Sequence, residues 1–161
     1  ANLSGARLSN ADVSQSELTG ADLSNAELYN TQLMGANLSE ANLARADLQK
    51  AQLTNTNLYR ANLTSAWLAS AQLQDANLSQ ANLFKSTLNS ANLQDADLSQ
   101  ANLMEASLIK ANLQDVDLQD ADLNKTILFK ASVSKAALIE AQLCLTSLPD
   151  YTMHSRDCDR T

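Results

Sequence analysis

Apolar residues recur at every fifth position along almost the whole chain. Thirty positions from residue 3 to residue 148 follow this spacing, and all of them are Leu except Val13 and Val133. A small residue stands two positions before each, and 23 of these thirty small residues are Ala. The spacing continues to position 148 without an insertion, so the 161-residue chain is largely a tandem array of five-residue repeats.

Neither a helix nor a straight strand buries a five-residue period. In an α-helix each Leu would lie about 140° further round the axis, and in a strand successive Leu residues would fall on opposite faces. A short extended segment followed by a bend buries both the Leu and the small residue, because residues two apart point to the same side. Four such segments close a coil, and coils stack at the strand spacing of about 4.8 Å. We therefore predict an all-β solenoid of about 7.5 coils of twenty residues.

The repeat A-(N/D)-L-x-x, seen at 41–43, 96–98 and 121–123, resembles the pentapeptide-repeat family, especially its cyanobacterial members. The resemblance covers residues 1–150 and implies a right-handed quadrilateral parallel β-helix of thirty repeats. Val116, at a small position, should strain its coil or mark a wider one. We expect residues 151–161 to cap the last coil, with Tyr151 and Met153 packed on it. Representative core residues are Leu43, Leu63, Leu83, Leu98, Leu103, Ala96 and Ala101.

Two groups of residues that should face outward are candidates for recognition. Apolar residues on two adjacent sides predict a contact surface, for a homodimer or for an unknown protein, and the alternative is scatter without function. A group of aspartates predicts an acidic face, either merely solvated or imitating the phosphates of DNA. The apolar residues are Phe84, Met104, Ile109, Ile127 and Phe129, and the acidic ones are Asp75, Asp95, Asp115, Asp117 and Asp120.

The two cysteines, Cys144 and Cys158, are fourteen residues apart near the end of the repeats. The tail can bring Cys158 back to the corner that Cys144 occupies, so a disulfide is one expectation, and two free thiols are the alternative. A disulfide would indicate the periplasm or a thylakoid lumen, and free thiols the cytoplasm. The closing segment resembles one in which Pro-Asp-Gly lies between two cysteines, but here Tyr151 replaces the Gly.

Composition narrows the function further. Three Gly and one Pro are too few for the turns of a conventional sandwich or barrel. The net charge of −7 argues against direct binding of nucleic acid. The sequence contains no stretch of about twenty apolar residues, so no membrane span is predicted. With one His and no nucleotide-binding or hydrolase motif, we expect no enzyme activity, metal or cofactor.

The sequence therefore favours a non-enzymatic structural or protein-interaction scaffold. One alternative is a DNA-mimicking binder of a type II topoisomerase such as gyrase, the activity that resemblance to quinolone-resistance members implies. This sequence departs from those members because its core series has no Phe, lysines interrupt its acidic faces and no loop projects. A second alternative is a regulatory protein binder, which nothing in the sequence separates from a scaffold.

Overall fold

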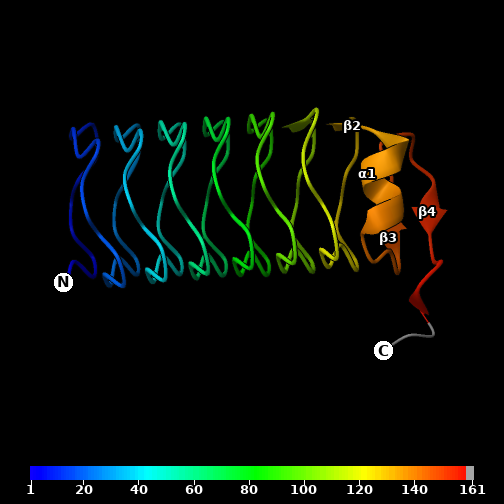
Figure 1. Ribbon diagram of the computed structural model, residues 1–161, viewed down its shortest axis with the longest axis horizontal. Helices are drawn as coiled ribbons and strands as arrows, with labels where there is room; N and C mark the ends of the chain where they lie inside the picture. The colour runs from blue at the N-terminus through cyan, green and yellow to red at the C-terminus, as the bar shows by residue number, and fades with distance from the viewer. Residues whose placement is uncertain (159–161) are drawn as a thin grey trace.

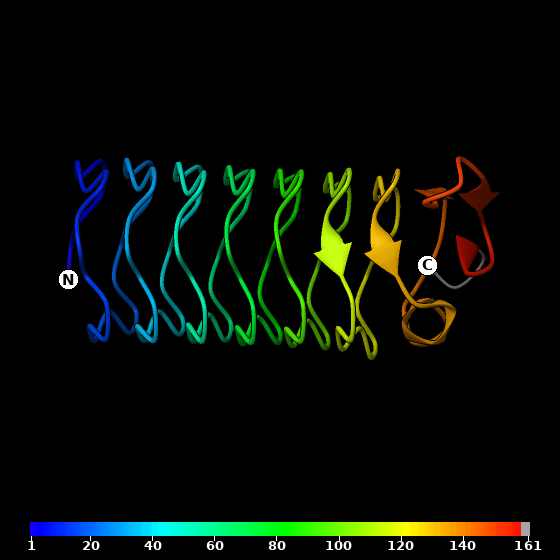
Figure 2. The same ribbon diagram turned by 90° about the horizontal axis from the view of Figure 1, so that it is seen from above.

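The structure is a computed structural model that describes residues 1–158. Similar coils stack along one axis, with the N-terminus at one end and the C-terminal segment at the other (Figure 1). The same stack seen from above shows that the winding continues from coil to coil until the last segments (Figure 2). The core therefore runs as a continuous column inside the coils.

Each coil pairs with the next in a register of twenty residues. The outward residue of a repeat forms a parallel bridge with the residue twenty positions later, as Asn42 does with Asn62. Around this bridge the Leu43 amide donates to the Asn62 carbonyl at 2.7 Å, and the Asn62 amide donates to the Ala41 carbonyl at 2.9 Å. The bridges confirm the predicted twenty-residue repeat of the chain.

The corners are hydrogen-bonded turns whose last residue has a positive φ. The amide of Ala46 donates to the carbonyl of Leu43 at 3.0 Å, and Arg45 between them has a φ of 59°. The same conformation returns at every fifth residue from 5 to 130, and only three of these residues are Gly. The left-handed conformation costs an ordinary residue about 1 kcal/mol, so the ladder hydrogen bonds and the filled core stabilise each corner against it.

The hydrogen bonds of the outward Asn explain why the second position of the repeat is polar. The side-chain oxygen of Asn62 accepts a hydrogen bond from the amide of Thr64 at 3.2 Å, which supports the following turn. Its amide nitrogen donates to the side-chain oxygen of Asn42, one coil earlier, at 3.0 Å. One side chain therefore stabilises both a corner and the stacking of two coils.

The lumen is filled by Leu and Ala. All seven representative core residues named from the sequence are buried, with exposed fractions of 0–1%. Four threonines at small positions are buried as well, and each hydroxyl donates to the carbonyl of a Leu 23 residues earlier, at 2.7–2.8 Å. Hydroxyls are therefore accepted in the core because each finds a backbone acceptor.

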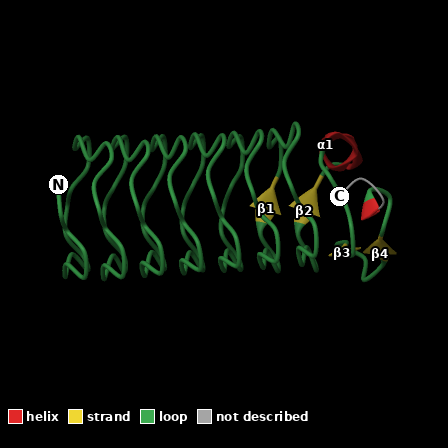
Figure 3. Ribbon diagram, turned by 90° about the horizontal axis from the view of Figure 1, so that it is seen from below, coloured by secondary structure: helices red, strands yellow, loops and turns green. Residues whose placement is uncertain are grey.

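The regular coil ends before the repeat does. Strands β1 (Asn112–Leu113) and β2 (Ser132–Val133) pair in parallel, and helix α1 (Lys135–Glu140) follows. Strands β3 (Thr146–Ser147) and β4 (Met153–His154) then form an antiparallel pair. Figure 3 shows α1 and the β3–β4 pair together at one end of the stack.

Helix α1 corrects the prediction of an all-β chain with turns up to residue 148. Ser134 begins the helix, and its hydroxyl accepts a hydrogen bond from the amide of Ala137 at 3.1 Å. The segment KAALIE consists mainly of good helix formers. No later coil supplies ladder partners here, so hydrogen bonds within a helix satisfy the backbone instead.

Val116 lies one coil before this helix. The residue one coil later is Ala136, which belongs to α1 and not to a β-coil. Val116 itself is buried, with 7% of its surface exposed. Both outcomes expected for Val116, a strained coil and a wider one, stay predictions.

Candidate interaction surface

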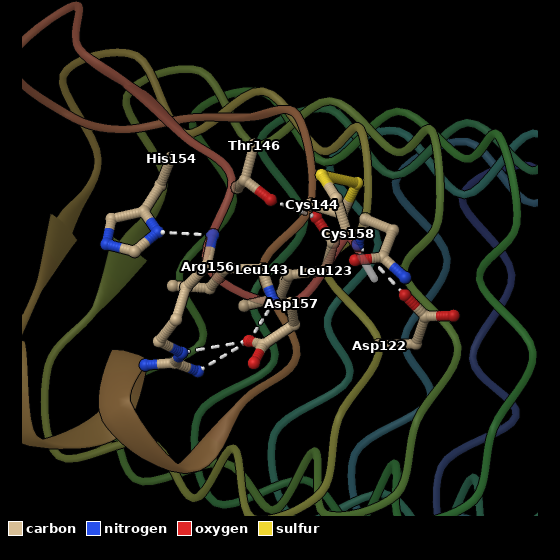
Figure 4. Close-up of a disulfide and its surroundings, with 10 residues drawn as sticks. Asp122, Leu123, Leu143, Cys144, Thr146, His154, Arg156, Asp157 and Cys158 are labelled. Atoms are coloured by element: carbon tan, nitrogen blue, oxygen red, sulfur yellow. Dashed lines mark hydrogen bonds and ion pairs between the residues drawn. A yellow bond between two sulfur atoms is a disulfide. The ribbon is translucent and has the colours of Figure 1, made fainter. Parts of the chain in front are cut away.

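The C-terminal segment closes the open edge of the last coil. Inside the stack, the Leu123 amide donates to the Gln142 carbonyl of the next coil, but Leu143 has no next coil. The carboxylate of Asp157 accepts from the Leu143 amide at 3.0 Å, and the Asp157 amide donates to the Leu143 carbonyl at 3.1 Å (Figure 4). A side chain and the backbone of one residue thus replace the missing strand.

The buried charge of Asp157 is paired. Asp157 is 5% exposed, and Nη2 of Arg156 lies 2.8 Å from its carboxylate. The same guanidinium donates to the carbonyl of Ala141, another backbone group at the end of the stack. The cap is therefore held by charge-assisted hydrogen bonds, which are stronger than neutral ones. The last three residues of the predicted tail, 159–161, lie outside the described residues.

A disulfide joins Cys144 to Cys158, which confirms the first of the two expectations for the cysteines. It closes a loop with a sequence separation of fourteen residues. Cys144 belongs to the last coil and Cys158 follows Asp157, so the covalent bond and the carboxylate pin the same stretch of tail (Figure 4).

The turn between β3 and β4 keeps the shape that Gly usually provides. The amide of Tyr151 donates to the carbonyl of Leu148, and Tyr151 itself has a φ of 70°. Asp150 accepts from the Thr152 hydroxyl at 2.6 Å and from its amide at 3.1 Å, and these bonds lower the pKa of Asp150 from its ordinary value. The replacement of Gly by Tyr151 thus leaves the turn in place, with strain at that residue.

Apolar side chains gather on the outer surface beside this turn. Ile127 bridges Ser147 in the ladder, and Ser147 pairs with Met153 across β3 and β4, so these three residues form one row. The ring of Tyr151 packs on Phe129 with 4.0 Å between centroids. The exposed fractions are 42% for Ile127, 50% for Leu145, 72% for Tyr151 and 60% for Met153. We call Ile127, Phe129, Leu145, Tyr151 and Met153 the C-terminal apolar patch.

The patch overlaps only partly with the residues selected from the sequence. Ile127 is exposed, whereas Phe84, Met104, Ile109 and Phe129 are half-buried. Met153 was expected to pack on the last coil but is mostly exposed. Leu145 was missed, although a large apolar residue at a corner position was a signal available in the sequence.

The five predicted aspartates are all exposed. Asp75, Asp95 and Asp115 follow one another at intervals of one coil on a corner, with φ between 54° and 57°. Asp117 lies on the next side, and its carboxylate accepts from the Gln119 amide at 2.9 Å. The acidic column is short, because Asn55 precedes it and Lys135 of α1 follows it.

Within residues 1–158, no group of three or more His, Cys, Asp or Glu side chains is placed to hold a metal ion. Over the same residues, no helix has the length and apolar character needed to cross a membrane.

Two hollows on the surface are notable. One of about 300 Å³ lies between α1 and β4, lined by Leu138, Ile139, His154 and Arg156 among others. Another, of about 680 Å³, lies on the outer face around Trp67.

Stacked coils around a filled lumen, closed at one end by a cap, define a β-helical repeat protein. The sequence model described as pentapeptide repeats matches residues 1–39, 36–71, 71–108, 86–124 and 106–148, so the chain belongs to the pentapeptide-repeat family. Its fold is the right-handed β-helix solenoid of that family. None of the curated proteins matches the sequence.

Several solved structures resemble the chain. HetL, involved in heterocyst differentiation regulation in the cyanobacterium Nostoc sp. strain PCC 7120, is 34% identical, with 95% of this chain and 78% of HetL covered and a TM-score of 0.43. Rfr23 from the cyanobacterium Cyanothece 51142 is 30% identical, with 68% and 85% covered and a TM-score of 0.54. QnrB1, a plasmid-mediated fluoroquinolone resistance protein, is 18% identical, with 93% and 89% covered and a TM-score of 0.57, a likeness of fold alone.

Proposed function

We propose that this protein is a non-enzymatic scaffold that binds another protein through its C-terminal apolar patch. The observation that carries the proposal is the exposure of large apolar side chains in a strained backbone. Leu145 and Tyr151 have φ values of 52° and 70°, yet 50% and 72% of their surfaces are exposed. Backbone preference does not account for such residues, and the packing of Tyr151 on Phe129 leaves most of the Tyr151 surface exposed. A contact surface accounts for both residues.

The partner is a protein of unknown identity or a second copy of the chain. A regulatory role, of the kind named for HetL in heterocyst differentiation, would use the same kind of surface. The cap disulfide supports residence in an oxidising compartment such as the periplasm or a thylakoid lumen. Turns at every fifth residue from 5 to 130, in a twenty-residue register, support a four-sided rod over that part of the predicted repeat domain 1–150.

We expect Leu145→Asn to stabilise the protein while weakening its binding to the partner. Asn tolerates the left-handed conformation, so the free energy of unfolding should rise by about 1 kcal/mol. The measurements are denaturant unfolding and quantitative capture of partner proteins from the native source, with light scattering to detect a dimer. A double variant, Ile127→Asn with Leu145→Asn, should reduce capture or dimerisation more strongly than the single one.

Met34→Asn is the matched control for these variants. Met34 is also apolar and 42% exposed, but it lies in the N-terminal half of the chain, far along the sequence from the patch. Capture by this control should equal capture by the original protein. If the double patch variant captured as much partner protein as the original protein does, the proposed contact surface would be contradicted.

We expect no inhibition of gyrase supercoiling at micromolar concentrations of this protein. A mimic of DNA needs acidic charge along the rod, but Asn55 and Lys135 bound the column of Asp75, Asp95 and Asp115. The measurement is a supercoiling assay. Inhibition that disappears when these three aspartates are changed to Asn would instead assign the DNA-mimicking function.

A further inference from the structure

Trp67 is the only tryptophan of the chain, and it stands on the outer surface. Its backbone bridges Asp47 on one side and Thr87 on the other, so the side chain projects outward from the middle of the ladder. Of its surface, 54% is exposed. A ring placed in this way contributes nothing to filling the lumen, and its role lies at the surface.

Four of the five other aromatic rings carry a cation from this chain, and the fifth, Tyr151, packs on Phe129 instead. Each cation lies 4.9–5.3 Å from its ring centroid, a distance at which the ring face attracts positive charge. Within residues 1–158 no cation lies over Trp67 in this way, although the indole is the side chain that attracts cations most strongly. The four rings and their cations are Tyr29 with Lys50, Tyr59 with Arg60, Phe84 with Lys85, and Phe129 with Lys130.

The surroundings of the ring are suited to an incoming cation. The hollow of about 680 Å³ beside Trp67 is lined by Glu27 and Asp47, with Arg45 as the one basic group. Glu27 also lies 3.5 Å from Arg7, but both side chains are more than half exposed, so water screens this ion pair. Two carboxylates against one guanidinium leave the hollow acidic beside an uncovered indole.

We propose that this Trp67 hollow binds a lysine or arginine side chain on an extended segment of the partner protein. The cation lies over the indole, and its head group is hydrogen-bonded by the carboxylates of Glu27 and Asp47. The inference rests on the proposed scaffold function and names the chemistry of its partner. Because no cation of residues 1–158 covers Trp67, its ring face can accept a cation of the partner, and this gives the site its specificity.

The position of the hollow connects it with the C-terminal apolar patch. Successive bridges join Trp67 to Thr87, Thr87 to Ser107, and Ser107 to Ile127, so Trp67 and Ile127 stand in one outward column. Three strand spacings separate them, or about 14 Å. An extended segment of about five residues spans that distance, so one partner segment can place a basic residue on Trp67 and an apolar residue on Ile127.

The test uses the peptide Gly-Arg-Gly-Arg-Gly with a fluorescent label. Anisotropy measures its dissociation constant, and the emission of Trp67, the sole tryptophan, reports binding of unlabelled peptide at the ring. We expect Trp67→Leu to weaken binding about tenfold and Asp47→Asn several-fold. Asn at position 47 keeps the acceptor that holds the Gln49 amide, so this substitution should leave the fold unchanged.

Asp95→Asn is the matched control, because it removes the same charge from an exposed corner away from Trp67. Its dissociation constant should change less than twofold, and a peptide with citrulline for arginine should not bind. Equal loss in Asp47→Asn and Asp95→Asn would assign binding to net charge and overturn the proposal. Unchanged Trp67 emission, or no arginine dependence, would also overturn it. The capture experiment with the patch variants decides the scaffold function separately, since it does not depend on Trp67.

Discussion

Leu98→Asp should unfold the centre of the stack. Leu98 is 0% exposed, and the lumen around it consists mainly of Leu and Ala, which offer no partner to a carboxylate. An unpaired buried charge costs several kcal/mol, a large part of the 5–15 kcal/mol that stabilises a typical domain. A loss of about 4 kcal/mol would lower the melting temperature by roughly 8–16 °C for a chain of this size. Thermal unfolding followed by circular dichroism measures it.

Ser90→Asp is the control for this substitution. Ser90 is exposed at a corner with a φ of 58°, and aspartates occupy equivalent corners at Asp75 and Asp95. The same charge should therefore leave the melting temperature within about 2 °C of the original. If Leu98→Asp melted at the same temperature as Ser90→Asp, the assignment of Leu98 to a filled lumen would be wrong.

Removal of the disulfide should release the cap and leave the coils intact. In the chain-entropy account, a loop of about fourteen residues contributes about 3 kcal/mol. In the double variant Cys144→Ser with Cys158→Ser, the amides of Leu143 and Asp157 should exchange hydrogen much faster. The amides of the central coils should exchange as before, because each repeat contacts only its neighbours. Hydrogen exchange followed by mass spectrometry distinguishes the two regions.

Reductant provides a second route to the same state. It should accelerate exchange at Leu143 and Asp157 in the original protein and have no effect on the double serine variant. Intact mass without reductant should be lower by two hydrogen atoms than the fully reduced mass. If the two intact masses were equal, or if reductant left hydrogen exchange in the cap unchanged, a structural disulfide at this end would be contradicted.

The core was predictable because one physical constraint determines it. A lumen of fixed width accepts Leu and a small residue at a strict spacing, and residues such as Leu98 and Ala96 carry that spacing in the sequence. The corners were harder, because residues such as Arg45 and Lys85 have no special preference for positive φ. Long-range ladder bonds impose that conformation, and a local reading of the sequence contains no sign of them.

Helix α1 and the C-terminal apolar patch are two features that the five-residue pattern does not predict. Ala136 and Leu138 keep the repeat phase, yet the absence of a following coil turns their segment into a helix. Leu145 and Met153 become exposed because of where the cap folds, which depends on the turn at Tyr151 and on Asp157. The disulfide was one of two expectations for the cysteines, because the corner position of Cys144 and the length of the tail allow it without excluding free thiols.

The twenty-residue register separates the interior of this rod from its exterior. A gain or loss of twenty residues would change the length of the rod and keep every outward column aligned. A gain or loss of five would still fill the lumen, yet it would turn everything beyond it by one side. Trp67 and Ile127 would then point in different directions without any change in the core. Evolution can therefore re-aim surfaces on this scaffold by single repeats while the stability of the interior is preserved.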